Sequence, residues 1–153
     1  MSEDKNIKVA RLIGLEKKAR EARNEDELYF VVANETRQII DYVSSFLLLK
    51  TPTDRFNIKA TSDLATVDRT SPLLTFIENF INNDKTIDKK EIQTLDVEKL
   101  AKNIKQTKPK NLPDKILYIP IMSPQRGLQG YLLLARQQEF TDSDTELARH
   151  LSV

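Results

Sequence analysis

The sequence predicts an α+β fold in which helices cover both faces of a central antiparallel sheet. The main observation is the stretch Lys115–Arg136, KILYIPIMSPQRGLQGYLLLAR, where two runs rich in Ile, Leu and Tyr flank the turn residues Pro-Gln-Arg-Gly. This pattern indicates two adjacent antiparallel strands. Both runs are apolar on both faces, which is typical of strands in the middle of a sheet with helices above and below.

A second hairpin is predicted between Val43 and Thr61, with its turn at Thr51–Asp54. Its first strand is apolar, whereas the second alternates apolar and polar residues from Phe56 to Thr61. Strict alternation places one face in the core and the other in water, so we expect this strand toward an edge of the sheet. The charged segment 82–95 leaves room for one further short strand.

Five segments carry signals for helices. Apolar residues recur at helical spacing over residues 7–22, from Asn24 to near Tyr42, from Pro72 to Ile81, and from Asp96 to before Pro109. Pro72 suits a first helical position, where its missing N–H costs no hydrogen bond. Thr141 and Asp144 resemble a capping box that starts a last helix. That helical pattern still runs at the final residue, so we expect residues 1–153 to form a single domain of a longer protein.

Composition narrows the classes of function. There is no cysteine, which removes disulfides, thiolate nucleophiles and cysteine metal sites, and agrees with a cytoplasmic location. The 24 Lys and Arg residues balance the 23 Asp and Glu residues, which argues against nucleic acid as a partner. No apolar segment suits a signal peptide or membrane span, so we expect no membrane contact by this segment. A membrane tether elsewhere in the full-length protein stays open.

The C-terminal third resembles a GAF domain. The resemblance is carried by Pro120-Ile121, by Gly127, by the strand Gly130–Leu134, and by the helix start Phe140-Thr141-Asp142 followed by Leu147. The order of elements along nearly the whole chain is also similar to that family. The resemblance implies a sheet of five to six strands, with the terminal helices on one face and a ligand pocket on the other. The segment Leu28–Tyr42 further looks like the N-terminal GAF segment of bacterial proteins that also carry a membrane-fusion or efflux adaptor module.

Members of the GAF family bind cyclic nucleotides, tetrapyrroles, haem, amino acids or small metabolites, and many bind no known ligand. This chain departs from several of them. It lacks the cysteine that attaches the chromophore in photoreceptor members, the cysteine nucleophiles of the methionine sulfoxide reductases, and the Asn-Lys-Phe-Asp-Glu signature of the cyclic-nucleotide binders. The resemblance therefore predicts no particular cofactor. The roles that stay compatible with it are sensing and protein interaction.

One polar cluster is a candidate ligand site. Arg69, Thr70 and Ser71 lie at the predicted start of a helix, where backbone N–H groups and hydroxyls favour an anion or carboxylate. The alternative is that Thr70 or Ser71 simply caps the helix. In a GAF arrangement we expect the walls of the pocket to come from apolar and aromatic residues, namely Phe46, Leu48, Phe76 and Tyr118.

The other polar groups indicate no catalytic, metal-binding or nucleic-acid-binding site. His150 is the only histidine, and without a second imidazole or a thiol no compact metal set forms around it. No Gly-x-Ser-x-Gly elbow is present. Six lysines between Lys99 and Lys115 lack interleaved Arg and aromatic residues, so we interpret them as a solvated face. We therefore expect no catalytic residue and no metal site.

The function predicted from sequence is that of a non-enzymatic, bacterial GAF domain that senses a small molecule and signals through its terminal helices to a downstream module. We expect a homodimer through those helices, with the amphipathic helix 7–22 as a surface for it. The alternative is a ligand-free module for protein interaction or dimerisation, its pocket packed shut by Phe76, Phe80 and Tyr118.

Overall fold

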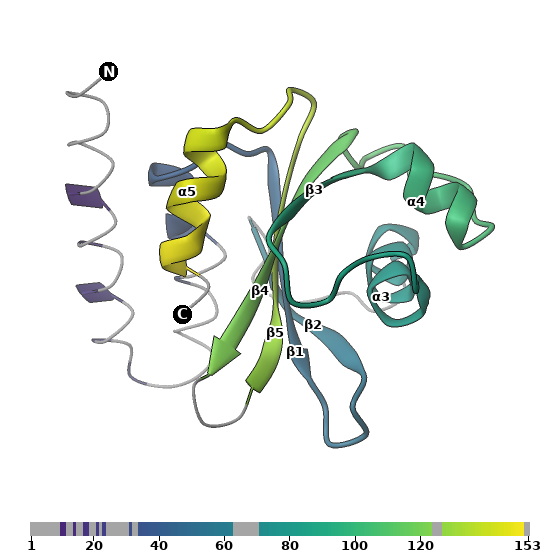
Figure 1. Cartoon of the computed structure of the whole chain (residues 1–153), viewed down its shortest axis with the longest axis horizontal. Coiled ribbons are helices and arrows are strands. Elements are labelled where there is room, and N and C mark those ends of the chain that lie inside the picture. The colour runs from purple at the N-terminus through teal and green to yellow at the C-terminus, as the bar shows by residue number, and fades with distance from the viewer. Residues whose placement is uncertain are drawn as a thin grey trace.

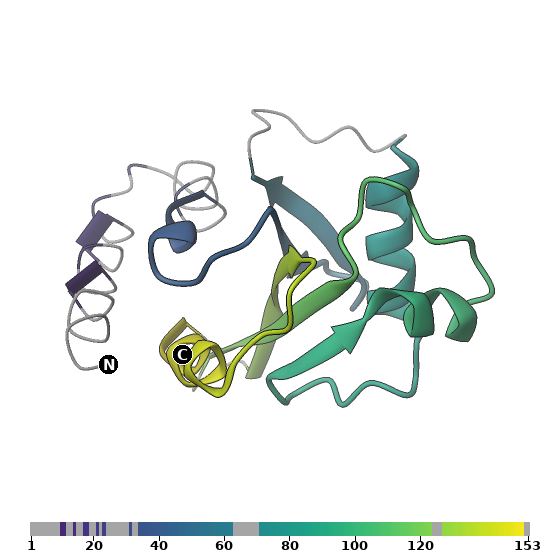
Figure 2. The same cartoon turned by 90° about the horizontal axis from the view of Figure 1, so that it is seen from above.

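The computed structural model describes residues 34–62, 71–123 and 127–151, together with residues 10, 11, 14, 17, 18, 21, 23 and 31. Three layers are visible in Figure 1, in which α5 lies on one side of the sheet and α3 and α4 lie on the other. Figure 2 shows the same layers from above, with the strands between the helices. Most of the predicted helix 7–22 lies outside the described residues, although residues 10, 11, 14, 17 and 18 are helical.

In the described part of the chain five strands form the sheet, in the order β2-β1-β5-β4-β3, and every neighbouring pair is antiparallel. They are β1 (Ser44–Lys50), β2 (Phe56–Thr61), β3 (Gln93–Asp96), β4 (Lys115–Ser123) and β5 (Gly127–Arg136). Both predicted hairpins are confirmed. Because β5 is central and β2 is at an edge, the positions inferred from the apolar patterns are confirmed as well.

The sheet separates two apolar cores, and β4 contributes to both. Ile116 and Tyr118 pack into the core beneath α3 and α4, whereas Leu117 and Ile119 pack into the core beneath α5. Alternate residues of a strand point to opposite faces, so a strand buried on both sides is apolar throughout. This arrangement explains why the stretch from Lys115 to Arg136 is apolar on both faces.

A β-bulge changes the alternation expected for β2. Leu47 pairs with Ala60 but Leu48 pairs with Ile58, which leaves Lys59 as an extra residue. After the bulge Thr61 pairs with Phe46 and is buried, although strict alternation predicts it in water. An extra residue shifts the phase of the side chains by one, so Thr61 returns to the core face.

The helix α3 (Pro72–Asn83) also closes the free edge of β2. The Asn82 side chain accepts a hydrogen bond from the Phe56 N–H at 2.8 Å and donates one to the Phe56 carbonyl at 3.0 Å. Glu78 accepts from the Ile58 N–H at 2.9 Å. An edge strand with satisfied backbone groups offers no template for another strand.

The predicted helix from Asp96 is α4 (Val97–Asn103), and the Asp96 side chain caps it through the Glu98 N–H. Its predicted end before Pro109 is confirmed, with Asn103 as the last helical residue. Lys105 has a φ of 55°, and the N–H groups of Lys105 and Gln106 bond to the carbonyls of Lys102 and Ala101. This left-handed Schellman ending stops the helix without a glycine.

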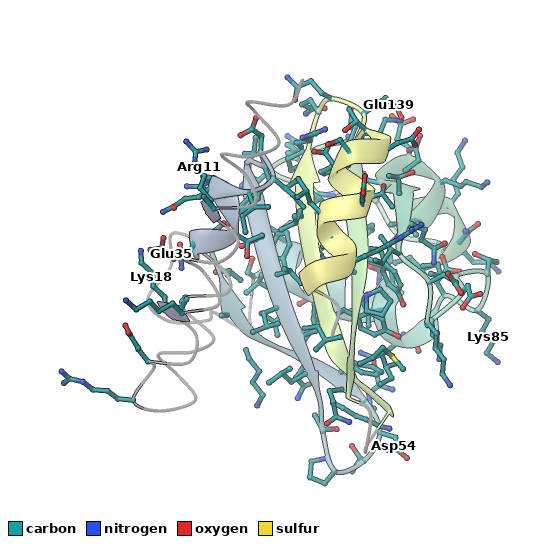
Figure 3. All side chains as sticks on the ribbon, turned by 60° about the vertical axis from the view of Figure 1, so that its left-hand side comes forward. Arg11, Lys18, Glu35, Asp54, Lys85 and Glu139 are labelled. Carbon is teal, nitrogen blue, oxygen red and sulfur yellow. The ribbon has the colours of Figure 1, made fainter. Side chains whose placement is uncertain are left out.

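The second predicted helix also ends earlier than expected, since a 3₁₀ turn, η1 (Thr36–Gln38), is its last helical part. Ile39 and Ile40 then pack in the core beneath α5 in the turn that follows, and both of their N–H groups donate to the Thr36 carbonyl. Its predicted start at Asn24 lies outside the described residues. In Figure 3, Lys18 lies beside Glu35, and their ion pair spans 3.1 Å.

The last helix, α5 (Asp142–Leu151), begins with the predicted capping box. Asp144 N–H donates to the Thr141 hydroxyl, and Thr141 N–H donates to the Asp144 carboxylate. The same carboxylate binds Arg136 at the end of β5 at 2.7 Å. No helix in the described part of the chain is long and apolar enough to cross a bilayer.

Candidate functional site

A cavity of about 310 Å³ lies where the start of β1, the end of β2 and the start of α3 meet. Five hydroxyl-bearing residues and three apolar residues line it: Ser44, Ser45, Thr61, Ser62, Ser71, Phe46, Leu73 and Leu74. None of these described lining residues carries a charge. The volume is at the lower end of the range for small-molecule sites, and an apolar wall with a few polar groups is typical of them.

The two strands place hydroxyls on the wall of the cavity. Ser44 pairs with Ala135, and Phe46 pairs with Leu133; both of these partners lie in the core beneath α3 and α4, so Ser44 and Phe46 face that side. The bulge in β2 brings Thr61 opposite Phe46 and therefore onto the same face. Neighbouring Ser62 is held by two bonds to Ser45, since its hydroxyl accepts from the Ser45 N–H and its own N–H donates to the Ser45 carbonyl.

Thr61 is the one described residue whose buried side-chain oxygen has no hydrogen-bond partner. The residue is only 4% exposed. A buried hydroxyl without a partner costs about 1–3 kcal/mol of desolvation. Rotation about the Cα–Cβ bond exchanges the threonine hydroxyl and methyl positions, so a group in the cavity could supply the missing bond.

The start of α3 forms another part of the wall. Ser71 is the N-cap residue in an extended conformation, yet its side chain makes no capping bond to any described N–H. Pro72 occupies the first helical position, and the first turn contains no acidic residue. The N–H groups of Leu73 and Leu74 have no carbonyl four residues earlier in the helix to bond, as at every helix start. The positive end of the helix dipole therefore lies at the cavity, and no described residue of the first turn is acidic.

The structure brings some of the predicted site residues together. Phe46 and Ser71 line the cavity. Leu48, Phe76 and Tyr118 lie in the same apolar core but are not part of this lining. Arg69 and Thr70 lie outside the described residues. Sequence reasoning missed Ser44, Ser45, Thr61, Ser62, Leu73 and Leu74. The last two lie just after the predicted helix start, which could have identified them.

The centre of this face of the sheet is filled by aromatic side chains. The ring of Tyr131 lies 4.6 Å from that of Tyr118 and 4.9 Å from that of Phe56, measured between centroids. The Tyr131 hydroxyl donates to the Lys89 carbonyl at 3.1 Å. Burial raises the pKa of Tyr118 far above its usual value, a hydrogen bond with Tyr131 adds to the shift, and burial raises the pKa of Tyr131 as well. These tyrosines are therefore neutral core residues.

Two further hollows lie on the same side of the sheet. One of about 280 Å³ is bordered by β3 and α4 and includes Asp96 and Asn103. The other, of about 530 Å³, lies between the start of α3 and the segment 106–110. Across the described residues, no group of three or more His, Cys, Asp or Glu side chains could hold a metal ion. The side chain of His150 lies outside the described residues.

Comparisons with known proteins agree with this architecture. No protein-family model and no curated protein matches the sequence. Among solved structures, the chain is similar to the phycocyanobilin-bound GAF domain of a cyanobacterial phytochrome, with a TM-score of 0.68, 12% identity, and coverage of 95% of this chain and 89% of that one. A phycoerythrobilin-bound GAF domain from a cyanobacterial phytochrome has a TM-score of 0.61 and 13% identity, with coverage of 95% of this chain and 94% of that one.

The GAF domain of a protein described as a sensor histidine kinase, from Pseudomonas syringae pv. tomato, has a TM-score of 0.61 and 14% identity, with coverage of 99% of this chain and 83% of that one. Identities this low speak to the fold and not to the ligand. The similarity nevertheless extends over nearly the whole chain. The chain therefore has the fold of a GAF domain.

Proposed function

We propose that this chain is a sensory or regulatory GAF domain that binds a small molecule in the cavity between β1, β2 and α3 and catalyses no reaction itself. The observation that carries the proposal is the cavity of about 310 Å³, because it combines hydroxyl-bearing residues with an apolar wall. The similar structures come from a phytochrome and a sensor histidine kinase, which supports a sensory role. The absence of cysteine from the sequence is consistent with a bacterial cytoplasm.

The ligand should be compact. Two of the similar domains are bilin-bound, but this sequence has no cysteine, and Tyr118 and Tyr131 fill the centre of the corresponding face. The cavity of about 310 Å³ lies at one end of the sheet, away from this aromatic centre. We therefore propose a ligand much smaller than a tetrapyrrole.

The geometry also supports a route from the cavity to α5. Ser44 and Ser45 pair with Ala135 and Leu134, and the Val43 N–H donates to the Ala135 carbonyl at 2.8 Å. The next residue, Arg136, holds the first turn of α5 through Asp144. A ligand that orders the start of β1 would therefore also order the residue that anchors α5. We propose that this is how binding reaches the terminal helix and a downstream module.

A second candidate function is a ligand-free interaction or dimerisation module. It is favoured by the complete burial of Phe76, Phe80 and Tyr118, which fill the middle of the face where a ligand would otherwise lie. The two proposals differ in the role of the cavity. Dimerisation through the terminal helices is compatible with either, and sedimentation of the full chain at increasing concentration tests it: a strict monomer would contradict the dimer.

An NMR-monitored screen of a general library of small compounds against the isotope-labelled chain tests the sensory proposal. We expect bound compounds to shift the amide signals of Ser44–Phe46, Thr61–Ser62 and Leu73–Leu74. The variant Ser44→Leu, which fills the cavity, should abolish these shifts, whereas Thr94→Leu on the exposed face of β3 should preserve them. Compounds that bind both variants equally, or that shift only other amides, would contradict the proposal.

A further inference from the structure

We infer that the ligand of this cavity is a small monocarboxylate with a short apolar part. The inference rests on the proposed function, since it assumes that the cavity between β1, β2 and α3 binds a small molecule. It goes further by naming the chemistry of that molecule. Two independent features carry it: the unpartnered hydroxyl of Thr61 and the uncapped start of α3.

Hydrogen-bond donors converge on this cavity from separate elements. Thr61 lines the cavity and has a buried hydroxyl without a partner, which must rotate about the Cα–Cβ bond to meet a ligand, and Ser44 lies on the same face of the sheet. From the wall formed by α3, Ser71 offers a hydroxyl that caps no described N–H, and Leu73 and Leu74 belong to the first helical turn, whose N–H groups have no carbonyl within the helix to bond. Hydroxyls and helix N–H groups together satisfy the two oxygens of a carboxylate.

The charges of the described lining residues favour a ligand with one negative charge over a ligand with two. The helix start favours an anion, and its first turn contains no acid that would compete. However, none of the described lining residues is a cation. A doubly charged phosphate would lose its hydration without an opposite charge beside it, at high cost. A carboxylate carries one charge, spread over two oxygens that neutral donors can bond.

The apolar wall determines the chemistry of the part of the ligand that extends beyond the carboxylate. Phe46, Leu73 and Leu74 border the cavity beside the donors, so a molecule that extends from the carboxylate meets hydrocarbon. A volume of about 310 Å³ is that of roughly ten water molecules at about 30 Å³ each. It therefore suits a ligand of about ten non-hydrogen atoms, such as a short-chain or aromatic monocarboxylic acid.

Isothermal titration of the chain at neutral pH with matched pairs of compounds tests the inference. The acids are butyrate, hexanoate and benzoate, and their neutral counterparts are butyramide, hexanamide and benzamide; inorganic phosphate is the third probe. We expect at least one acid to bind at least about tenfold more tightly than its amide, because hydrogen bonds to a charged group are stronger. Phosphate should bind more weakly than that acid.

The variant Thr61→Val keeps the shape of the side chain and removes the hydroxyl. We expect it to weaken binding of the acid by about 10- to 100-fold, the effect of losing one bond to a charged group. Its melting temperature without ligand should stay the same or rise, because an unpartnered buried hydroxyl has been removed. Thr94→Val, at an exposed position on β3, is the matched control and should bind like the parent chain.

The possible failures can be told apart. If the amides bind at the cavity as tightly as the acids, or phosphate binds more tightly, the carboxylate inference is wrong and the sensory proposal stands. If Thr61→Val binds the acid as the parent does, the inference is also wrong. If no compound of the general library or of this series perturbs the cavity, both the inference and the sensory proposal fail.

Discussion

Arg136 anchors the first turn of α5, and its replacement by methionine should destabilise the fold strongly. Its guanidinium binds the Asp144 carboxylate at 2.7 Å and donates to the backbone carbonyls of Asp41 at 2.9 Å and of Gln138 at 3.2 Å. It also stacks on Phe140, with 4.1 Å to the ring centroid. One side chain therefore ties the end of β5 to α5 and to the segment that precedes β1.

The magnitude follows from burial. The Arg136 and Asp144 side chains are 11% and 6% exposed, so methionine at position 136 would leave a buried carboxylate without its counter-charge. Removing one partner of a buried ion pair costs about 3–5 kcal/mol. Because the whole free energy of unfolding of a domain is about 5–15 kcal/mol, this is a large part of it. The melting temperature should fall by roughly 6–20 °C, at about 2–4 °C per kcal/mol for this size.

Urea unfolding followed by circular dichroism measures the loss. The matched control is Lys50→Met, which breaks an exposed pair with Asp54 at the tip of the β1–β2 hairpin (Figure 3) and should cost less than about 1 kcal/mol. The double variant Arg136→Met/Asp144→Asn removes the stranded charge and should be more stable than Arg136→Met alone. A loss below about 1 kcal/mol in Arg136→Met, or no recovery in the double variant, would refute the reasoning.

Three further substitutions test other parts of the fold. Gly130→Ala should lower the free energy of unfolding in urea by about 1–3 kcal/mol or more, because the new Cβ would lie 2.1 Å from the Leu48 carbonyl oxygen. A variant as stable as the parent chain would contradict that close approach. Asn82→Leu should lower the unfolding free energy by about 1–3 kcal/mol and promote association in sedimentation, because it frees the edge of β2. The control is Asn83→Leu at an exposed position, and equal behaviour of the two variants would argue against edge protection. Above about pH 10 the unfolded chain loses tyrosine protons that the folded chain keeps, so the free energy of unfolding falls as the pH rises. In Tyr118→Phe this decrease should be shallower by about 1.4 kcal/mol per pH unit. An unchanged slope would contradict the raised pKa of Tyr118.

Signals that lie within a few residues allowed much of the fold to be predicted. The starts of the helices at Pro72, Asp96 and Thr141 each depend on a cap or a first-turn residue, and all three are confirmed. The paired apolar runs from Lys115 to Arg136 predicted β4 and β5 because their side chains alternate between two cores. The sequence predicted that α4 ends before Pro109 but not at which residue, because a lysine at position 105 takes the left-handed conformation that usually marks glycine.

The candidate site was predictable only in part, and for a related reason. Ser71 was found because a helix start is a local feature. Thr61 was missed because the bulge at Lys59 exists only in the pairing of β2 with β1, and that pairing decides which face Thr61 occupies. Leu48 and Tyr118 were predicted as pocket walls from their apolar character, but the same character also suits the packed core in which they lie.

Hydrogen exchange of the full chain, followed by mass spectrometry with and without a saturating compound from the screen, tests the central claim most directly. Sensing in the cavity predicts slower exchange in the peptides that contain Ser44–Phe46 and Leu73–Leu74, and also in α5, which Arg136 links to β1. The variant Arg136→Met should keep the protection at the cavity and lose it in α5. Unchanged exchange around the cavity at saturation, or protection confined to the β3 and α4 end of the sheet, would contradict the claim.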